Sequence, residues 1–151
     1  MTEEMGRYYA RRAPEYDRIY ELAPWRRGLS ALRRRLPWFF RGRRLFEVAC
    51  GTGYWTQYAA QEAVSVLAMD LNEETLALAR ARAWTGHVAF ERADAYTRST
   101  GPPVCDAGLA AFWLSHVDRG RMSDFLAAFH SYLAPERAGP DVRRAARGPG
   151  A

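Results

Sequence analysis

The chain has 151 residues and a formal net charge of +5, and all 22 of its basic residues are arginines. Hydrophobic residues make up 48% and charged residues 26%, which excludes a disordered chain and fits a single domain with a core of its own. No apolar run approaches the roughly 20 residues that a membrane-spanning helix needs, and residues 1–4 lack the form of a signal peptide. We therefore expect a cytoplasmic protein without a membrane partner.

The N-terminal part of the chain is predicted to be helical. Residues 8–20 carry tyrosines among charged residues, with helical spacing on both sides of Pro14, which must start or interrupt a helix. Residues 25–36 form the next predicted helix, which Pro37 should end. Its apolar side consists of Trp25, Leu29, Leu32 and Leu36.

Arginines dominate the other side of this helix and the residues after it. Between Glu21 and Glu47 the acidic residues are absent and the basic ones are Arg26, Arg27, Arg33, Arg34, Arg35, Arg41, Arg43 and Arg44. Such a stripe could bind the phosphates of RNA or an acidic substrate. We favour a solvated surface, because neither a lysine-rich tail nor the interleaved aromatic residues of a stacking platform accompany it.

The functional interpretation depends on residues 45–56. An apolar run that contains a carboxylate is followed by small residues at 49, 51 and 53 and by a segment with helical potential over 54–62. This pattern predicts a strand, a tight turn and a helix. Small residues let the backbone approach a ligand, and the free N–H groups of the helix offer hydrogen bonds. Glu47 would face a cation or hydroxyl donors of that ligand.

The same motif distinguishes between two kinds of nucleotide ligand. A dinucleotide fingerprint requires Gly or Ala where the chain has Tyr54 or Thr56, which weakens an NAD-linked oxidoreductase as an interpretation. Residues 47–53 read acid-x-small-x-Gly-x-Gly and resemble the class I S-adenosylmethionine (SAM) dependent methyltransferases, whose first small residue is usually Gly rather than Ala49. The resemblance covers residues 8–135 and implies SAM as the cofactor. It implies cofactor contacts for Glu47, Ala49, Gly51 and Gly53.

The resemblance also gives the N-terminal segment a role, because in the family such a segment folds over the methionine end of the cofactor. Tyr9, Arg11 and Tyr16 are then candidates to touch the methionine moiety. Equally, the tyrosines could pack the helix onto the domain and keep their hydroxyls in water.

A second acid follows the next predicted strand. The apolar run 64–69 ends at Asp70, 23 residues after Glu47, which is about the spacing at which such an acid meets a ribose. The resemblance implies that Asp70 binds the ribose of SAM and that Leu71 lies against adenine. Asn72 is then expected to cap a helix.

A third acid follows the strand predicted over residues 88–93. The resemblance implies that Asp94 and Ala95 bind the adenine ring and its amino group. Asp94 could otherwise cap the turn before Tyr96.

The fourth predicted strand, 104–111, leads into residues that the resemblance places beside the substrate. Phe112 is assigned to the cofactor pocket, and Phe112 and Trp113 are as suited to wall that pocket as to fill core. His116 is the titratable side chain near this edge that is suited to act as a catalytic base at neutral pH, although a single histidine is often structural.

The last elements complete the predicted fold. An amphipathic helix over 118–133 precedes residues 136–151, which lack the β-branched residues of a buried strand. We predict an α/β fold with a Rossmann-like, doubly wound parallel sheet in the order 3-2-1-4, without the strands 5-7-6 that are usual in the family. The predicted parts are N-terminal cap helices over 1–44, a SAM-binding core over 45–135 and an irregular tail. The fourth strand, exposed at the edge, could pair two copies in a homodimer.

Together these features predict the transfer of a methyl group from SAM to a small molecule that the sequence does not define. A non-catalytic SAM-binding module, and an RNA-binding protein or RNA methyltransferase that uses the arginine-rich helix, remain alternatives. Cys50 and Cys105 are not clustered, which indicates reduced thiols and no metal site.

Overall fold

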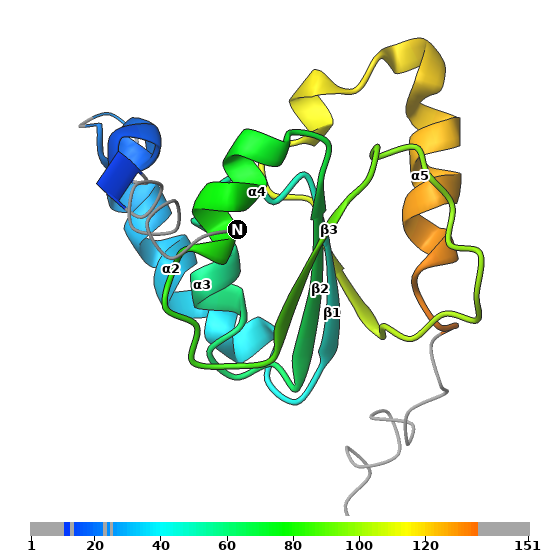
Figure 1. Ribbon diagram of the computed structural model, residues 1–151, viewed down its shortest axis with the longest axis horizontal. Coiled ribbons are helices and arrows are strands. Elements are labelled where there is room, and N and C mark those ends of the chain that lie inside the picture. Colours follow the sequence, from blue (N-terminus) through cyan, green and yellow to red (C-terminus); the bar gives the residue numbers. More distant parts are fainter. Residues whose placement is uncertain (1–10, 13, 23, 25, 136–151) are drawn as a thin grey trace, which may run out of the picture.

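A four-stranded parallel sheet forms the centre of the computed structural model, which describes residues 11–12, 14–22, 24 and 26–135. The strand order is β3-β2-β1-β4 (Figure 1), so the predicted order and fold class are confirmed. The strands are β1 (Arg44–Val48), β2 (Ser65–Asp70), β3 (Val88–Arg92) and β4 (Ala107–Leu109). The predictions for Tyr9, Trp25 and the tail lie outside the described residues.

Helices cover both faces of this sheet. α2 (Arg26–Phe39), α3 (Thr56–Ala59) and α4 (Glu73–Arg80) lie on one side, and α5 (Met122–Ser131) lies on the other (Figure 1). Three short 3-10 helices are also present: η1 (Arg18–Glu21), η2 (Leu114–His116) and η3 (Arg119–Arg121). The helix predicted over 118–133 is therefore divided into η3 and α5.

β1 is the most buried strand because it pairs with β2 on one side and β4 on the other. Leu45 packs toward α3 and α4 in a cluster with Ala59, whereas Phe46 and Val48 pack toward α5 in a cluster with Phe125. Successive side chains of a strand point to opposite faces, and a parallel sheet covered by helices buries both. The apolar run before the Gly-rich turn is thereby explained.

α2 continues through Pro37 to Phe39, so the prediction that Pro37 ends the helix is wrong. A proline removes one backbone donor, and here it does so in the last turn. The N–H of Phe40 still bonds to the carbonyl of Leu36 at 3.2 Å. The helix therefore continues three residues beyond Leu36, its predicted last residue.

α3 is much shorter than the helix predicted over 54–62. The N–H groups of Tyr58 and Gln61 bond to carbonyls three residues back, at 3.1 and 3.4 Å, which tightens the chain into turns on either side of the regular part. A four-residue helix is a weaker source of the free N–H groups that were expected to bond to a ligand. Ligand contacts at this edge must come from the loop and the side chains.

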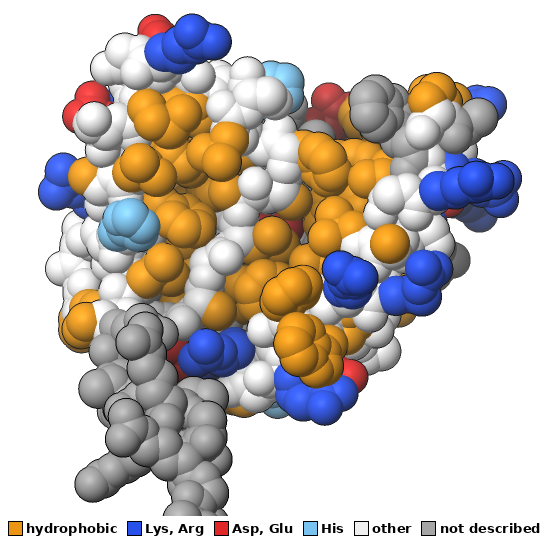
Figure 2. Space-filling model, turned by 180° about the vertical axis from the view of Figure 1, so that it is seen from behind, with side chains coloured by type: hydrophobic (Ala, Val, Ile, Leu, Met, Phe, Trp, Pro, Cys, Tyr) orange, Lys and Arg blue, Asp and Glu red, His pale blue; other side chains and the backbone are white. Residues whose placement is uncertain are grey.

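β4 is also shorter than the predicted strand 104–111, and its edge is partly covered. Cys105, just before β4, forms a parallel bridge with Leu133, and the N–H of Ala134 donates to the carbonyl of Cys105 at 2.7 Å. The segment after α5 thus pairs with the chain where an unpaired edge was expected. From behind, the molecule shows a broad apolar area (Figure 2). Val104 and Phe112, which flank β4 in the sequence, are at least half exposed.

No helix in the described part of the chain is long and apolar enough to cross a membrane.

Candidate active site

The loop after β1 has an unusual backbone at the edge where the strands end. Ala49, Gly51 and Gly53 have φ values of 53°, 55° and 75°. This left-handed region is open to glycine but costs roughly 1–2 kcal/mol for other residues. The two glycines of the motif are therefore required by the turn, and Ala49 is strained. Phe112, after β4, is similarly strained at φ 58°.

The two glycines have different surroundings. Gly51 lines a cavity, and its N–H donates to Oδ2 of Asp70 at 2.8 Å. A Cβ on Gly51 would meet nothing within 4 Å, whereas one on Gly53 would lie 2.9 Å from the ring of Trp84. Gly53 lines neither of the cavities described below. It serves the packing of Trp84 under the loop, and its predicted contact with a cofactor is not evident in the geometry.

Glu47 is the buried acid of the site. It is 1% exposed, and its Oε2 has no hydrogen-bond partner among the described residues. Burial raises the pKa of this carboxyl to about 8, and the nearby charge of Asp70 adds to the shift. Three further buried polar atoms near the loop form no regular hydrogen bond in the described part of the chain: Tyr54 Oη, Trp55 Nε1 and Thr56 Oγ1, although the Thr56 side chain is close enough to Glu47 to lower its pKa. Such groups are costly unless something bonds to them.

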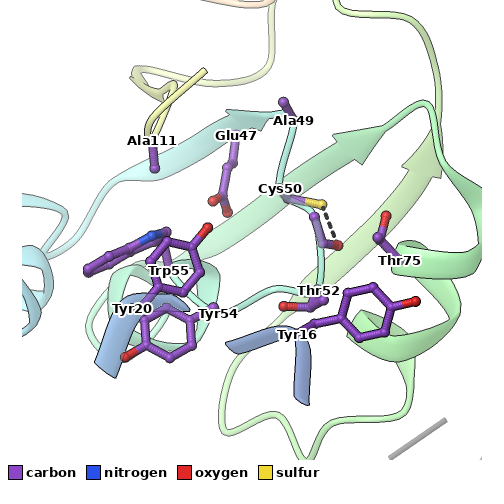
Figure 3. Close-up of a pocket in the computed structure, with 11 residues that line it drawn as sticks. Tyr16, Tyr20, Glu47, Ala49, Cys50, Thr52, Tyr54, Trp55, Thr75 and Ala111 are labelled. Carbon is purple, nitrogen blue, oxygen red and sulfur yellow. Dashed lines mark hydrogen bonds between the residues drawn. The ribbon is translucent and has the colours of Figure 1, made fainter. Parts of the chain in front are cut away.

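These residues enclose the first cavity, which has a volume of about 200 Å³ (Figure 3). Glu47, Ala49 and Gly51 line it together with aromatic side chains. The ring of Tyr20 stacks on Tyr54 at 4.5 Å, and other aromatic lining residues are Tyr16 and Trp55. The site therefore combines a buried carboxylate with aromatic faces, two groups that attract cations.

Tyr16 lines this cavity as predicted, but its hydroxyl is engaged elsewhere. It donates to Oε1 of Glu74 on α4 at 2.9 Å, and Arg12 bonds to the same oxygen at 3.2 Å. Tyr16 therefore offers the cavity its ring. Arg11 is exposed.

A buried ion pair fixes the N-terminal segment over the Gly-rich loop. Thr52 Oγ1 donates to Oδ1 of Asp17 at 2.8 Å, and Arg82 pairs with the other oxygen of this carboxylate. Arg82 Nε also donates to the carbonyl of Thr52 at 2.6 Å. Asp17 is 8% exposed. This connection holds Tyr16 and Tyr20 at the cavity, and the sequence analysis missed it.

A second cavity of about 200 Å³ lies where β2 and β3 end. Its lining includes four predicted cofactor residues, Asp70, Leu71, Asp94 and Ala95, together with Ala49, Ala93, Tyr96 and Trp113. Ala49 also lines the first cavity, so the two cavities meet at this residue. Their combined size is in the range of ligand pockets, roughly 300–1,000 Å³.

The two acids of the second cavity already have partners, whereas the buried Nε1 of Trp113, which also lines this cavity, has none among the described residues. Asp70 accepts from the N–H groups of Gly51 at 2.8 Å and Asn72 at 2.9 Å, one on each oxygen. Asp94 accepts from the N–H of Tyr96 at 2.9 Å, which is the turn-capping role considered as an alternative. Each carboxylate oxygen has two lone pairs, so both acids keep acceptor capacity for a ligand. Leu71 is 58% exposed, an apolar surface suited to a flat ring.

The structure does not bring the remaining predicted residues into either cavity. His116 is exposed, with its ring 6.0 Å from that of Trp113, a lining residue of the second cavity. Phe112 is 51% exposed, and its ring lies 5.4 Å from Trp55. Both follow β4 and lie at the rim.

Several lining residues were not predicted as contacts. Tyr20, Tyr54 and Trp55 wall the first cavity, and Tyr96 walls the second, where the guanidinium of Arg121 covers its ring at 3.7 Å. The signal available was their position, because they lie in the turns after strand ends or in the N-terminal segment. Cys50 also lines the first cavity, and burial raises the pKa of its thiol well above the usual value.

A parallel sheet in the order 3-2-1-4, with acids at the ends of three strands and a Gly-rich loop that lines two cavities, defines a Rossmann-like fold. The chain belongs to the methyltransferase-domain family, which matches residues 45–136.

Three comparisons illustrate this membership. A protein of Geobacillus sp. (strain WCH70) named as a methyltransferase is 33% identical over 93 residues, which are 60% of this chain and 35% of that protein. The complex of DhpI with SAH is 33% identical, with a TM-score of 0.66, over 88% of this chain and 64% of that one. The DhpI-SAM-HEP complex is 32% identical, with a TM-score of 0.67, over 85% and 58%. The chain thus spans between one third and two thirds of these relatives.

Proposed function

We propose that the two joined cavities bind SAM and that the protein transfers its methyl group to a small molecule. Membership of the methyltransferase-domain family supports this proposal, as do the structures of DhpI with SAM and with SAH. The observation that carries it is the unpartnered Oε2 of Glu47, buried against aromatic rings at the end of β1. A ligand with a cationic end and an adenosine end would satisfy both cavities.

The adenosine end is assigned to the second cavity. Asp70 has lone pairs left for two ribose hydroxyls while it holds the loop N–H of Gly51. Leu71 and Ala95 offer apolar contact to adenine, and Asp94 offers an acceptor for its amino group. These assignments use the free capacity of groups that already hold the loop in shape.

The methionine end is assigned to the first cavity. There the amino group would give Glu47 the missing partner, and a positive charge beside it would favour the ionised carboxylate. The faces of Tyr20, Tyr54 and Trp55 would attract a sulfonium through their π-electrons. The ion pair of Asp17 with Arg82 would keep this wall in place.

Bound SAM supplies a methyl group on a positively charged sulfur that many nucleophiles can attack. The chain must orient the acceptor and exclude water, which needs little side-chain chemistry. Tyr20 and Phe112, whose rings are 6.1 Å apart, lie where an acceptor would approach the first cavity. His116 remains the proposed base, and its exposed position requires that the acceptor reach the rim beyond Trp113.

Calorimetry with SAM, S-adenosylhomocysteine and NAD tests the proposal. SAM and its demethylated product should bind, and NAD, which shares the adenosine, should bind far more weakly because it lacks the amino acid end. Binding of NAD in preference to SAM would exclude the proposal and favour an oxidoreductase. The matched variants Glu47→Gln and Glu91→Gln each remove one carboxylate, but only the first should weaken SAM binding.

A non-catalytic SAM-binding module is the second candidate, because the chain spans 64% or less of the solved relatives given above. It predicts SAM binding without release of S-adenosylhomocysteine in the presence of candidate acceptors.

Pairing of two copies through the β4 side is a separate proposal, supported by the apolar area in Figure 2. Light scattering of the purified chain over a dilution series would test it.

A further inference from the structure

α2 carries a basic groove on the side that faces away from the core. The α2 groove has a volume of about 580 Å³ and is lined by Arg26, Arg27, Ser30, Arg33 and Arg34. These positions follow the helical repeat, so their side chains share one face. At a rise of 1.5 Å per residue the row extends about 12 Å along the helix.

The arginines of the α2 groove differ in their partners from five arginines elsewhere in the chain. Arg41 pairs with Glu62 and Arg82 with Asp17, and Arg12, Arg44 and Arg80 are also paired with acids. Within the described residues, no carboxylate pairs with an arginine of the groove.

One side chain of the groove is both desolvated and unmatched. Arg33 Nε is buried and has no hydrogen-bond partner among the residues that the structure describes, although the guanidinium lies 5.8 Å from the ring centre of Tyr54. Arg34 donates to Ser30 Oγ at 2.9 Å, a neutral partner that leaves the charge uncompensated. The groove thus concentrates positive charge, which an anion would neutralise.

One exposed aromatic ring, that of Trp38, continues the same face. Trp38 follows Arg34 by four residues, one helical turn, and is 64% exposed, while the neighbouring Phe39 is 55% exposed. Their rings meet edge to face at 5.3 Å. A solvated surface was favoured because both a lysine-rich tail and interleaved aromatic residues are absent; the exposed ring of Trp38 beside the arginines weakens the second of these reasons.

We propose that the α2 groove and Trp38 bind single-stranded nucleic acid, with phosphates on the arginines and a base stacked on Trp38. An extended row of charges beside an exposed ring is the combination that such strands use. A membrane surface is less suited, because the apolar side of α2, including Leu36, is already packed against Tyr54 and Trp55. The proposal uses neither cavity of the cofactor site and stands independently of it.

Fluorescence anisotropy with a labelled oligouridylate of about 12 nucleotides, over a salt series from about 50 to 200 mM, tests this proposal. Arg27→Ser with Arg34→Ser should raise the Kd about tenfold or more. The slope of log K against log salt should fall by about 1.4, since each lost phosphate contact accounts for about 0.7 on a single strand. Trp38→Ala should raise the Kd roughly fivefold or more with an unchanged slope.

The matched control replaces Arg98 and Arg119, two exposed arginines outside α2, by serine. It lowers the net charge by the same amount as the groove variant. The Kd at fixed salt should change by no more than about twofold, through the loss of long-range attraction alone. Equal losses in both double variants would show a net-charge effect and overturn the proposal. So would binding of inorganic phosphate, or of vesicles containing phosphatidylserine, without binding of the oligonucleotide. Circular dichroism would confirm that each variant is folded.

Discussion

The acids of the two cavities at the carboxyl edge of the sheet differ in their hydrogen bonds. In the first, Glu47 is buried, and its Oε2 has no described partner. In the second, Asp70 and Asp94 already accept hydrogen bonds from backbone N–H groups. A ligand therefore supplies a missing partner to a buried acid in the first cavity. In the second it meets two acids that are already bonded, beside the unpartnered Nε1 of Trp113. The first cavity should therefore select ligands by their charge, and the second cavity should select them by their shape.

The largest effect is expected at Asp70, which lines the second cavity and accepts a hydrogen bond from the N–H of Gly51, a lining residue of the first. Asp70→Ala removes the acceptor of the Gly51 and Asn72 N–H groups and, under the proposed function, the ribose acceptor. SAM affinity measured by calorimetry should fall at least about 100-fold, which corresponds to roughly 2.7 kcal/mol.

Asp94→Ala is the matched change in the same cavity. Asp94 holds only a local turn, so its loss should weaken SAM binding by about tenfold or less. Equal losses for Asp70→Ala and Asp94→Ala would contradict the special position of Asp70. Asp70→Asn, which keeps one acceptor oxygen, separates lost binding from lost folding, and a thermal melt of each variant provides the control.

The next effect distinguishes the ligand side of the loop from its core side. Gly53→Ala combines backbone strain with the clash against Trp84 and should lower the free energy of unfolding by about 2–4 kcal/mol. Gly51→Ala meets only the strain and should cost about 1–2 kcal/mol. Urea denaturation measures both values. If Trp84→Leu does not relieve the Gly53→Ala defect, packing against Trp84 is not the reason for that glycine.

A third prediction concerns the pH dependence of stability, which the buried acid should control. The pKa of Glu47 is about 8 in the folded chain and about 4.5 when unfolded, so between these values only the folded state holds the proton. The free energy of unfolding should therefore fall as the pH rises from about 4.5 to 8, by at most about 1.4 kcal/mol per pH unit. Above pH 8 this contribution should level off.

Glu47→Gln should remove this slope, because the amide does not titrate. Thermal unfolding at pH 5, 6, 7 and 8 in one buffer series (about one unit apart) compares the variant with the wild type and with Glu91→Gln, an exposed change on β3. Parallel profiles for wild type and Glu47→Gln would show that another group controls the pH dependence. A flat profile only for Glu47→Gln confirms the contrast between the two cavities.

The sequence predicted the parts of this site that depend on short-range pattern. Apolar runs and spaced acids place Glu47, Asp70 and Asp94 after consecutive parallel strands, and chain order then brings them to one edge. Pairings over long separations left no such pattern. Asp17 meets Arg82 across 65 residues, and the reason for Gly53 is the distant ring of Trp84. The bridge of Cys105 with Leu133, which covers part of the edge beside β4, likewise joins residues far apart in the sequence.

The smallest effect concerns Ala49, the residue shared by both cavities. Its φ of 53° is a conformation that favours glycine, the usual residue of the resembling family at this position. Ala49→Gly relieves roughly 1–2 kcal/mol of backbone strain in the folded state. It also stabilises the unfolded chain through added conformational entropy, by roughly 0.4–1 kcal/mol, which offsets part of that gain. The net gain of about 0.5–1 kcal/mol should raise the melting temperature by about 1–4 °C.

Ala110→Gly is the control for this change, because Ala110 follows β4 without a left-handed φ. There the same replacement should lower stability by about 0.5–1 kcal/mol, since no strain is relieved. SAM affinity should change by less than about twofold in Ala49→Gly, because the methyl group provides no hydrogen bond and the backbone keeps its course. A loss of stability in Ala49→Gly would mean that the methyl packs between the cavities, and that their junction depends on this side chain rather than on the turn.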